Sequence, residues 1–145
     1  MTPIKRIMTP IKRTLSIDPG YRVKGHGCAC ALFHDLTLRS VWFERPIGVD
    51  RLCSEDIDTV VWEKPQYDKR SDSVPVEVII ELTAQGATLA ALYAGRDSAI
   101  IVERTPRQWK GSMPKPICHD IMWDELSPEE RTVLGGDRIK REIDK

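Results

Sequence analysis

The sequence lacks the features that mark membrane, secreted or metal-stapled proteins. No apolar run approaches the roughly 20 residues needed to cross a bilayer, and no apolar stretch of the signal-peptide kind follows the basic N-terminus. The four cysteines show no paired metal-binding spacing, so we expect free thiols in a reducing compartment. These absences predict a cytoplasmic protein that has no membrane partner.

The sequence also lacks net charge, because 22 Lys and Arg residues balance 22 Asp and Glu residues. Domains that bind nucleic acid usually carry a basic excess, so the balance argues against such a partner. The distribution argues the other way, since residues 1–13 carry only basic charges and acids concentrate further along the chain, as at Asp124, Glu125, Glu129 and Glu130. A basic face on a neutral protein is therefore compatible with this composition.

Length and a repeat suggest the domain organisation. The chain has 145 residues, which fits one domain with a real core. The segment MTPIKR occurs at residues 1–6 and again at 8–13. We expect residues 1–13 to be a disordered basic arm that contributes little to the fold, with contact to DNA phosphates as the alternative, and residues 14–145 to form a single domain.

Alternation of apolar and polar residues predicts the first four strands. Residues 14–18, 27–33 and 38–45 read as three strands joined by short links, which favours an antiparallel meander. Residues 58–63 (DTVVWE) predict a fourth strand, which Pro65 ends.

The next segment changes to the three- and four-residue spacing of a helix. Asp72 or Ser73 can cap this helix, Pro75 fits its first turn, and Gly95 is the expected stop.

The remaining segments complete an α/β fold. Residues 98–103 predict a short buried fifth strand, a loop rich in Pro and Gly follows through Pro116, and residues 117–126 and 137–145 are expected to be helical. The crossover helix makes strands four and five parallel. We therefore predict a mixed five-stranded sheet, with three antiparallel strands followed by two parallel ones, and helices on its faces.

Two carboxylates carry the candidate chemistry. Asp18 and Glu63 each end a predicted strand, the first and the fourth. If those strands pair, the two acids converge at one edge of the sheet and repel each other unless a cation neutralises them. Hard oxygen ligands suit Mg²⁺, for which Mn²⁺ can substitute, and carboxylate sites with paired metals stabilise in-line phosphodiester displacement.

Three motifs resemble those of a known nuclease family. Residues 17–20 (IDPG) resemble the first-strand motif of RuvC-type Holliday-junction resolvases, and residues 62–66 (WEKPQ) resemble their fourth-strand motif. Residues 105–111 (TPRQWKG), followed by Pro114 and Lys115, are similar to a loop of phage-encoded members. The motifs occur in the family's order, and the resemblance covers roughly residues 15–130.

The resemblance implies an RNase H-like fold and a specific activity. Asp18 and Glu63 would be the metal-binding catalytic carboxylates of a magnesium-dependent endonuclease that resolves Holliday junctions or other branched double-stranded DNA in a bacterial or phage-infected cell. A metal-activated water would be the nucleophile, and the product would carry a 5′-phosphate. The family also suggests a homodimer, which would place two sites on the symmetric strands of a junction.

The same resemblance places further residues against the DNA. These are Lys64, Gln66, Tyr67, Trp109 and Lys110. The lysines could equally be solvated charges, and Trp109 could be an indole that anchors the core or the loop.

The chain departs from the family at its C-terminal part. The family closes its site with one or two carboxylates on a final helix, and no such stretch follows the WKG segment. We expect that the sequence stops short of the catalytic helix. A substitute ligand from Asp137 or Asp144, or an inactive relative, are the alternatives.

Other interpretations of the sequence remain open. The same fold could act on an RNA–DNA hybrid, although the WKG and EKPQ segments favour the resolvase. A non-catalytic junction-binding protein or structural subunit fits the missing carboxylates. An Asp-Pro-Gly after a first strand is also found in sugar-kinase-like ATPases, which need two lobes. His26, Cys28 and Cys30 share one strand face, and we expect thiols packed in the sheet, because no fourth metal ligand stands at a recognisable spacing.

Overall fold

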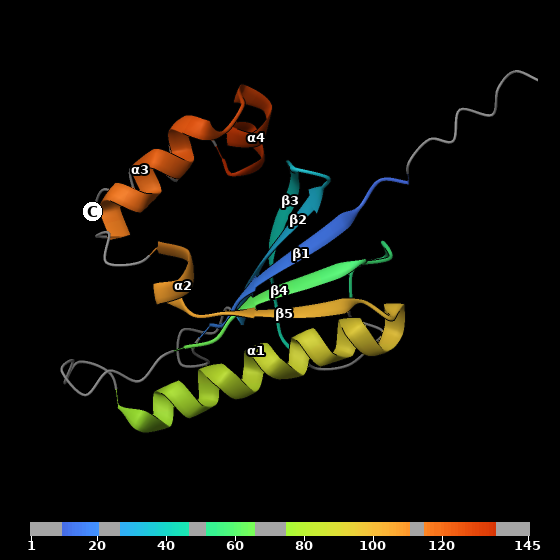
Figure 1. The fold of residues 1–145 in the computed structure, drawn as a ribbon, viewed down its shortest axis with the longest axis vertical. Helices are drawn as coiled ribbons and strands as arrows, with labels where there is room; N and C mark the ends of the chain where they lie inside the picture. Colours follow the sequence, from blue (N-terminus) through green and yellow to red (C-terminus); the bar gives the residue numbers. More distant parts are fainter. Residues whose placement is uncertain (1–9, 21–26, 47–51, 66–74, 111–114, 136–145) are drawn as a thin grey trace, which may run out of the picture.

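The computed structural model describes residues 10–20, 27–46, 52–65, 75–110 and 115–135. Its centre is a five-stranded sheet with the order β3-β2-β1-β4-β5 (Figure 1). The elements in chain order are β1 (Arg13–Asp18), β2 (Cys28–His34), β3 (Thr37–Glu44), β4 (Thr59–Glu63), α1 (Val76–Asp97), β5 (Ile100–Arg104), α2 (Pro106–Lys110), α3 (Lys115–Glu125) and α4 (Pro128–Val133).

The pairing of the strands confirms the predicted mixed sheet. β1 pairs antiparallel with β2, and β2 pairs antiparallel with β3 across a two-residue turn in which Asp35 adopts a positive φ of 52°. β1 pairs parallel with β4, and β4 pairs parallel with β5. Helix α1 makes the crossover between β4 and β5, which is why these two strands run in the same direction.

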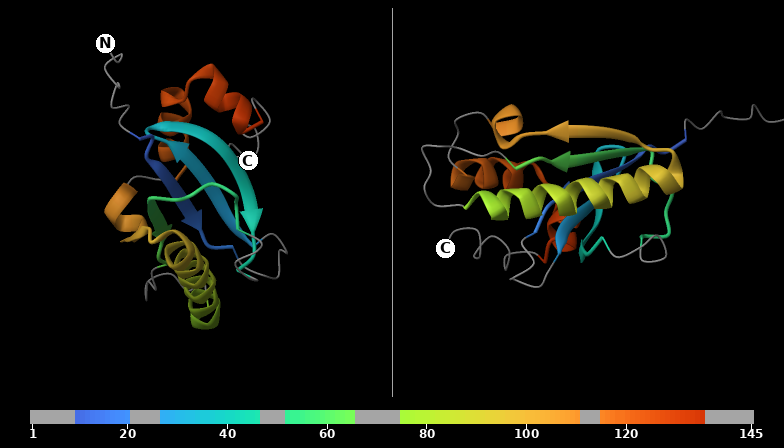
Figure 2. Two further views of the ribbon diagram at one scale, coloured as in Figure 1. Left: turned by 90° about the vertical axis from the view of Figure 1, so that its right-hand side faces the viewer. Right: turned by 90° about the horizontal axis from the view of Figure 1, so that it is seen from below.

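Helix α1 covers one face of the sheet and closes the main core. Alternate residues of the strands point toward it, because side chains in a strand alternate between the two faces. The views in Figure 2 show α1 along one side of the sheet, with α3 and α4 on the other side. The core cluster consists of Leu15, Ile17, Cys28, Cys30, Leu32, Ile57, Val60, Trp62, Leu89, Ala90 and Tyr93.

Helix α4 packs against β3, and a carboxylate on α4 accepts a hydrogen bond from the strand. Ser127 and Glu130 form a reciprocal capping box at its start, with Pro128 in the first turn. The other carboxylate oxygen of Glu130 accepts a hydrogen bond from the backbone N–H of Leu38 at 2.8 Å. Because these hydrogen bonds favour the charged form, they lower the pKa of Glu130.

Arg96 and Asp97 fix the segment that leads into β4. The Arg96 guanidinium contacts both carboxylate oxygens of Asp97 at 2.6 and 2.7 Å, and it also donates to the backbone carbonyls of Cys53 and Glu55. Asp97 in turn accepts a hydrogen bond from the backbone N–H of Ile57 at 2.9 Å. The C-terminal end of α1 therefore holds the start of β4 in place.

The ends of α1 differ from the sequence prediction. The helix begins at Val76 with Pro75 at the N-cap position and no side-chain cap, and the predicted caps Asp72 and Ser73 lie outside the described residues. The helix also continues through Gly95, and Ser98 ends it in the left-handed conformation. Tertiary contacts of Arg96 and Asp97 extend the last turn beyond the glycine.

One further prediction needs correction. The fifth strand was expected to be buried, but β5 is the edge strand of the sheet, and Ile100 and Ile101 are 67% and 45% exposed. Among the described residues, helix α1 is long and apolar enough to cross a membrane by length and composition alone, with 22 residues and a mean hydropathy of 1.3. That is weak evidence for a membrane, because core helices of soluble proteins reach the same threshold.

The N-terminal boundary of the fold lies before residue 14. β1 begins at Arg13, whose side chain contacts Glu55 at 3.0 Å and whose backbone N–H donates to Asp58 at 2.8 Å. Lys12 exchanges hydrogen bonds with Asp35, one through each backbone N–H. Residues 12 and 13 thus belong to the folded domain, while residues 1–9 of the expected arm lie outside the described residues.

Candidate functional site

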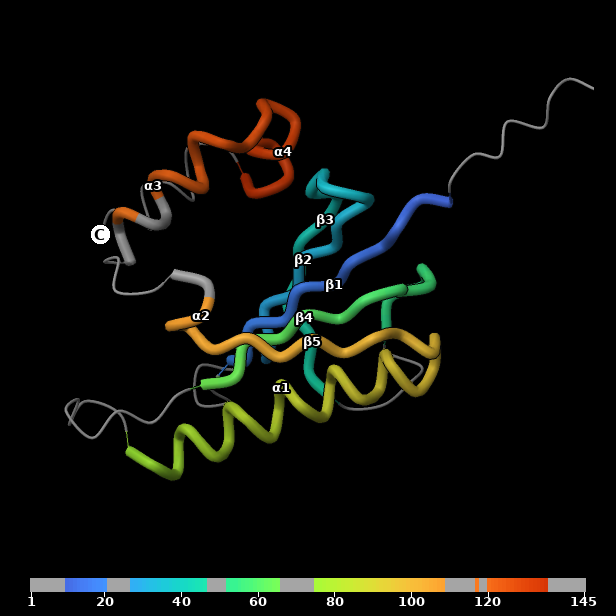
Figure 3. The backbone as a smooth tube through the Cα atoms, in the orientation of Figure 1, coloured from blue at the N-terminus to red at the C-terminus, as the bar shows by residue number. Residues whose placement is uncertain are grey.

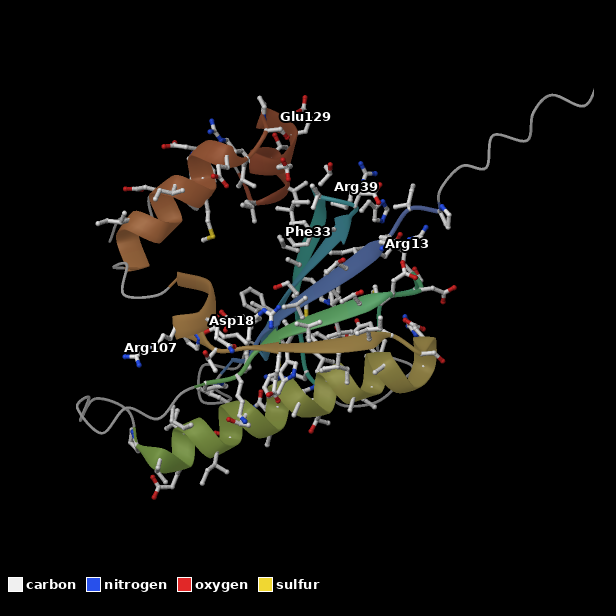
Figure 4. The ribbon with its side chains drawn as sticks, viewed as in Figure 1. Arg13, Asp18, Phe33, Arg39, Arg107 and Glu129 are labelled. Carbon is white, nitrogen blue, oxygen red and sulfur yellow. The ribbon has the colours of Figure 1, made fainter. Side chains whose placement is uncertain are left out.

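The parallel pairing of β1 and β4 brings Asp18 and Glu63 together. Ile17 and Trp62 are partners in the register, so the next residue of each strand leaves the sheet at the same edge. Figure 3 shows the two strands running side by side toward this edge. In Figure 4, Asp18 lies at the end of the sheet where α2 begins.

Both carboxylates line one pocket of about 270 Å³. The pocket opens on the face of the sheet opposite the main core, because Asp18 alternates with the buried Ile17 and Glu63 alternates with the buried Trp62. Asp18 is exposed and Glu63 is half-buried. The full lining consists of Ser16, Ile17, Asp18, Val61, Glu63, Arg104 and Met122.

Helix α1 packs closely against this edge of the sheet on the side of the main core. A Cβ atom on Gly86 would lie 2.6 Å from the Pro19 side chain and 2.8 Å from the Trp62 ring, which is closer than real contacts allow. Pro19 follows Asp18, and Trp62 precedes Glu63. The absence of a side chain at position 86 therefore lets the helix seat both carboxylate-bearing strand ends at once.

Arg104 and Met122 line the pocket but were not among the predicted site residues. Arg104 is the last residue of β5 and the register partner of Glu63, and Met122 comes from α3. The position of Arg104 was a usable signal, since the C-terminal ends of three parallel strands meet at one edge of a sheet. Nothing in the local sequence around Met122 indicates that α3 packs over this edge.

The segment after β5 forms a helix, although a loop was predicted there. Thr105 and Gln108 make reciprocal hydrogen bonds: the Thr105 N–H donates to the Gln108 side chain at 2.9 Å, and the Gln108 N–H donates to the Thr105 hydroxyl at 3.3 Å. With Pro106 as the first helical residue, this is a capping box that starts α2. The T-x-x-Q pattern of residues 105–108 is the sequence signal for this helix start.

The predicted DNA-binding residues lie around this edge where the structure describes them. Lys64 is exposed, and its backbone N–H donates to the Arg104 carbonyl at 2.8 Å, so it directly follows the β4–β5 pair. Trp109 and Lys110 are the last residues of α2. Gln66 and Tyr67 lie outside the described residues.

The carboxylates at this edge are of the kind that Mg²⁺ binds. Mg²⁺ keeps several waters and is usually held by one or two carboxylates together with substrate phosphates, so Asp18 and Glu63 are the residues of this pocket that could hold such an ion. In the described part of the chain, no group of three or more His, Cys, Asp or Glu side chains is arranged to hold a metal. The alternative ligands Asp137 and Asp144 lie outside that part.

The cysteines of β2 are buried among core side chains, as expected. Cys28 and Cys30 both face α1, and burial raises the pKa of each thiol. Cys30 lies beside Glu44, a buried carboxylate that accepts hydrogen bonds from the Tyr93 hydroxyl at 2.7 Å and the Trp42 indole at 2.9 Å. His26 lies outside the described residues.

Comparison of the chain with protein-family models and with curated proteins gives no match in either case.

Proposed function

We propose that this protein is a magnesium-dependent endonuclease that hydrolyses a phosphodiester of branched DNA, such as a Holliday junction. The observation that carries the proposal is the convergence of Asp18 and Glu63 on one pocket at the ends of two parallel strands. The motif resemblance in residues 17–20, 62–66 and 105–111 supports the same activity and points to four-way junctions as the substrate.

The reaction would exchange one phosphorus–oxygen bond for another. Oxygen from water attacks the phosphorus atom, the bond to the 3′-oxygen breaks, and the products are a 5′-phosphate and a 3′-hydroxyl that receives a proton. Asp18 and Glu63 would hold a Mg²⁺ ion, which supplies Lewis-acid charge to the phosphate when bound. Without a cation, the two carboxylates would repel the phosphate, and their geometry would then oppose DNA binding.

The other side chains of the pocket would position the substrate. Ile17, Val61 and Met122 give one side of the pocket an apolar surface, which limits the water around the reacting phosphate. Lys64, which is exposed beside the pocket, would neutralise a neighbouring phosphate on the strand being cut. Both roles are inferred from the positions of these side chains at the edge of the sheet.

A homodimer is part of the same proposal, and the outer face of α1 supports it. Val76 and Ile80 on this face are 43% and 64% exposed. The exposed stripe continues with small residues, namely Ala84, Ala87, Ala91 and Gly95. An apolar stripe of this length on a helix is suited to pack against its own copy around a two-fold axis.

A non-catalytic junction-binding protein is the second candidate. It is favoured by one observation, that the described residues bring two carboxylates to the pocket and no third. The fold and the surface around Lys64 would serve binding in the same way in either case. The two candidates therefore differ only in cleavage.

Single-turnover cleavage of a synthetic four-way junction in Mg²⁺ tests the proposal. Asp18→Asn and Glu63→Gln keep the side-chain size and remove the charge that holds the cation, so each should abolish cleavage and leave junction binding nearly intact. Glu129→Gln, an exposed change on α4 at the other end of the molecule, should cleave like wild type (Figure 4).

Each other outcome selects a different function. Tight binding of the junction without cleavage by the wild-type protein would identify the non-catalytic binder. Equal affinity for a linear duplex would leave a general nucleic-acid binder. Preferred cleavage of an RNA–DNA hybrid would move the activity to that substrate.

A further inference from the structure

We infer that Arg104 binds the scissile phosphate and supplies the positive charge that a second metal ion provides in two-metal nucleases. The inference rests on the proposed nuclease function and assigns a role to a residue outside the three resembling motifs. It follows from the position of Arg104, from the composition of the pocket and from the chemistry of the guanidinium group.

The position of Arg104 is fixed by the sheet. Arg104 is the register partner of Glu63 in the parallel β4–β5 pair, so the two side chains project from the same face of the sheet. Arg104 lines the same pocket as Asp18 and Glu63, and it is the only cation among the lining residues, all of which belong to the described part of the chain.

The charges of the pocket residues are consistent with a phosphate-binding role for Arg104. Two carboxylates suffice for one Mg²⁺, and no third acid joins them among the described residues. A phosphodiester that passes through displacement spreads negative charge over its oxygens, and this charge is stabilised either by metal ions or by an Arg or Lys clamp. Because the described pocket offers ligands for a single ion, the guanidinium of Arg104 would supply the second positive charge.

The guanidinium of Arg104 has donors to offer. Its recorded hydrogen bond in the described part of the chain is a long contact of 3.4 Å from Nη1 to the carbonyl of the adjacent Glu103. Arg104 is exposed at the end of an edge strand, so a phosphate can reach it. A planar guanidinium can contact two phosphate oxygens at once, which the ammonium group of Lys cannot do.

The test uses Arg104→Met, Arg104→Lys and a matched control. Arg39→Met removes the same charge from β3 at the end of the sheet away from Asp18 (Figure 4). The first readout is single-turnover cleavage of a four-way junction in Mg²⁺. We expect Arg104→Met to slow cleavage by about 10²–10³-fold, the usual effect of losing one transition-state donor, and Arg104→Lys to recover part of the loss. Arg39→Met should cleave at the wild-type rate.

The second readout does not depend on cleavage. Junction binding is measured over a range of salt concentrations in an Asp18→Asn background, which keeps the DNA intact. Loss of one phosphate contact should make the slope of log affinity against log salt shallower by about 0.9 for Arg104→Met, whereas Arg104→Lys and Arg39→Met should keep it. Calorimetry should find Mg²⁺ binding to Arg104→Met as tight as in wild type or tighter, because a nearby positive charge is removed.

The outcomes distinguish a failure of this inference from a failure of the proposed nuclease function. If Arg104→Met cleaves at the wild-type rate, or if its salt slope is unchanged, the inference is overturned and the proposed nuclease function still stands. Weaker Mg²⁺ binding in Arg104→Met would identify a residue that only positions the carboxylates, which also overturns it. If the wild-type protein binds the junction without cleaving it, the proposed nuclease function fails, and with it the inferred scissile contact.

Discussion

Ile17 and Trp62 are register partners in the parallel β1–β4 pair, and each is followed in the chain by one carboxylate of the site. Both side chains are buried against α1, so the alternation of the strand turns the next residues, Asp18 and Glu63, to the opposite face. Core packing of two apolar residues thus decides where two acids meet.

Magnesium should stabilise the folded protein through Asp18 and Glu63. A ligand that binds only the folded state at 100 times its Kd stabilises that state by about 2.7 kcal/mol, so the melting temperature should rise with Mg²⁺ concentration. Asp18→Asn should remove most of this rise, and Glu129→Gln should keep it. Thermal melts over a Mg²⁺ titration make the comparison, and an equal rise in Asp18→Asn would place the ion elsewhere.

Gly86→Ala should destabilise the protein, although alanine is the better helix former. The new Cβ would meet Pro19 and the Trp62 ring at less than 3 Å, and overpacking of this kind costs about 1–3 kcal/mol, against up to about 1 kcal/mol gained in helix propensity. Gly95→Ala is the matched control, because its Cβ would meet nothing within 4 Å. Urea unfolding should show a loss for the first and a gain for the second; a gain for both would contradict the close packing.

Removal of residues 10–13 in addition to residues 1–9 should weaken the fold. A chain that starts at Pro10 keeps the Lys12–Asp35 and Arg13–Glu55 contacts, whereas a chain that starts at Thr14 loses both. Each lost backbone hydrogen bond costs about 0.5–1.5 kcal/mol, and the exposed ion pair adds up to about 1 kcal/mol. Melting temperatures of the two truncated chains should differ, and equal values would show that these contacts contribute nothing.

Ile80→Glu should dissociate the proposed homodimer. A charge within an apolar helix interface must be desolvated on association, which is costly without a partner. Ile100→Glu makes the same change on the exposed edge strand β5 and should leave the oligomeric state unchanged. Sedimentation velocity reports both. A monomeric wild-type protein, or a dimer that survives Ile80→Glu, would exclude α1 as the interface.

Asp97→Asn should flatten the acid side of the stability profile. The hydrogen bonds from Arg96, opposed in part by burial, lower the pKa of Asp97 below its usual value. A carboxyl with a lowered folded-state pKa contributes stability above its unfolded pKa of about 4, and this contribution is lost as pH falls through the folded-state pKa. The wild-type protein should therefore lose stability over that range more steeply than Asp97→Asn.

The control for this pH dependence is Asp56→Asn, which changes an exposed acid in the segment that Asp97 contacts. Unfolding by urea between pH 6 and pH 2 should give profiles for wild type and Asp56→Asn that run in parallel. At neutral pH, Asp97→Asn should be less stable than wild type by about 1–3 kcal/mol, because a charged hydrogen-bond acceptor is lost. Parallel profiles for all three proteins would show that the Arg96–Asp97 contact does not stabilise the fold.

Local pattern was sufficient for most of the fold. Residue alternation located four strands within one or two residues, and the switch to helical spacing before Gly95 located the crossover helix, from which the parallel pairing of β4 and β5 follows. The loop predicted after the fifth strand was wrong because Thr105 and Gln108 cap a helix there, and no helix was predicted at residues 128–133, where Ser127 and Glu130 form a capping box. A further error came where tertiary contacts of Asp97 extended a helix past a glycine.

The sequence by itself determined that Asp18 and Glu63 end two strands, because alternation and the following proline and glycine are local properties. Only the tertiary structure decided that the two carboxylates share a pocket with Arg104 and Met122. That requires the order of strands in the sheet, the register between β4 and β5, and the packing of α3 above them. These depend on contacts between residues far apart in the chain, which no local pattern specifies.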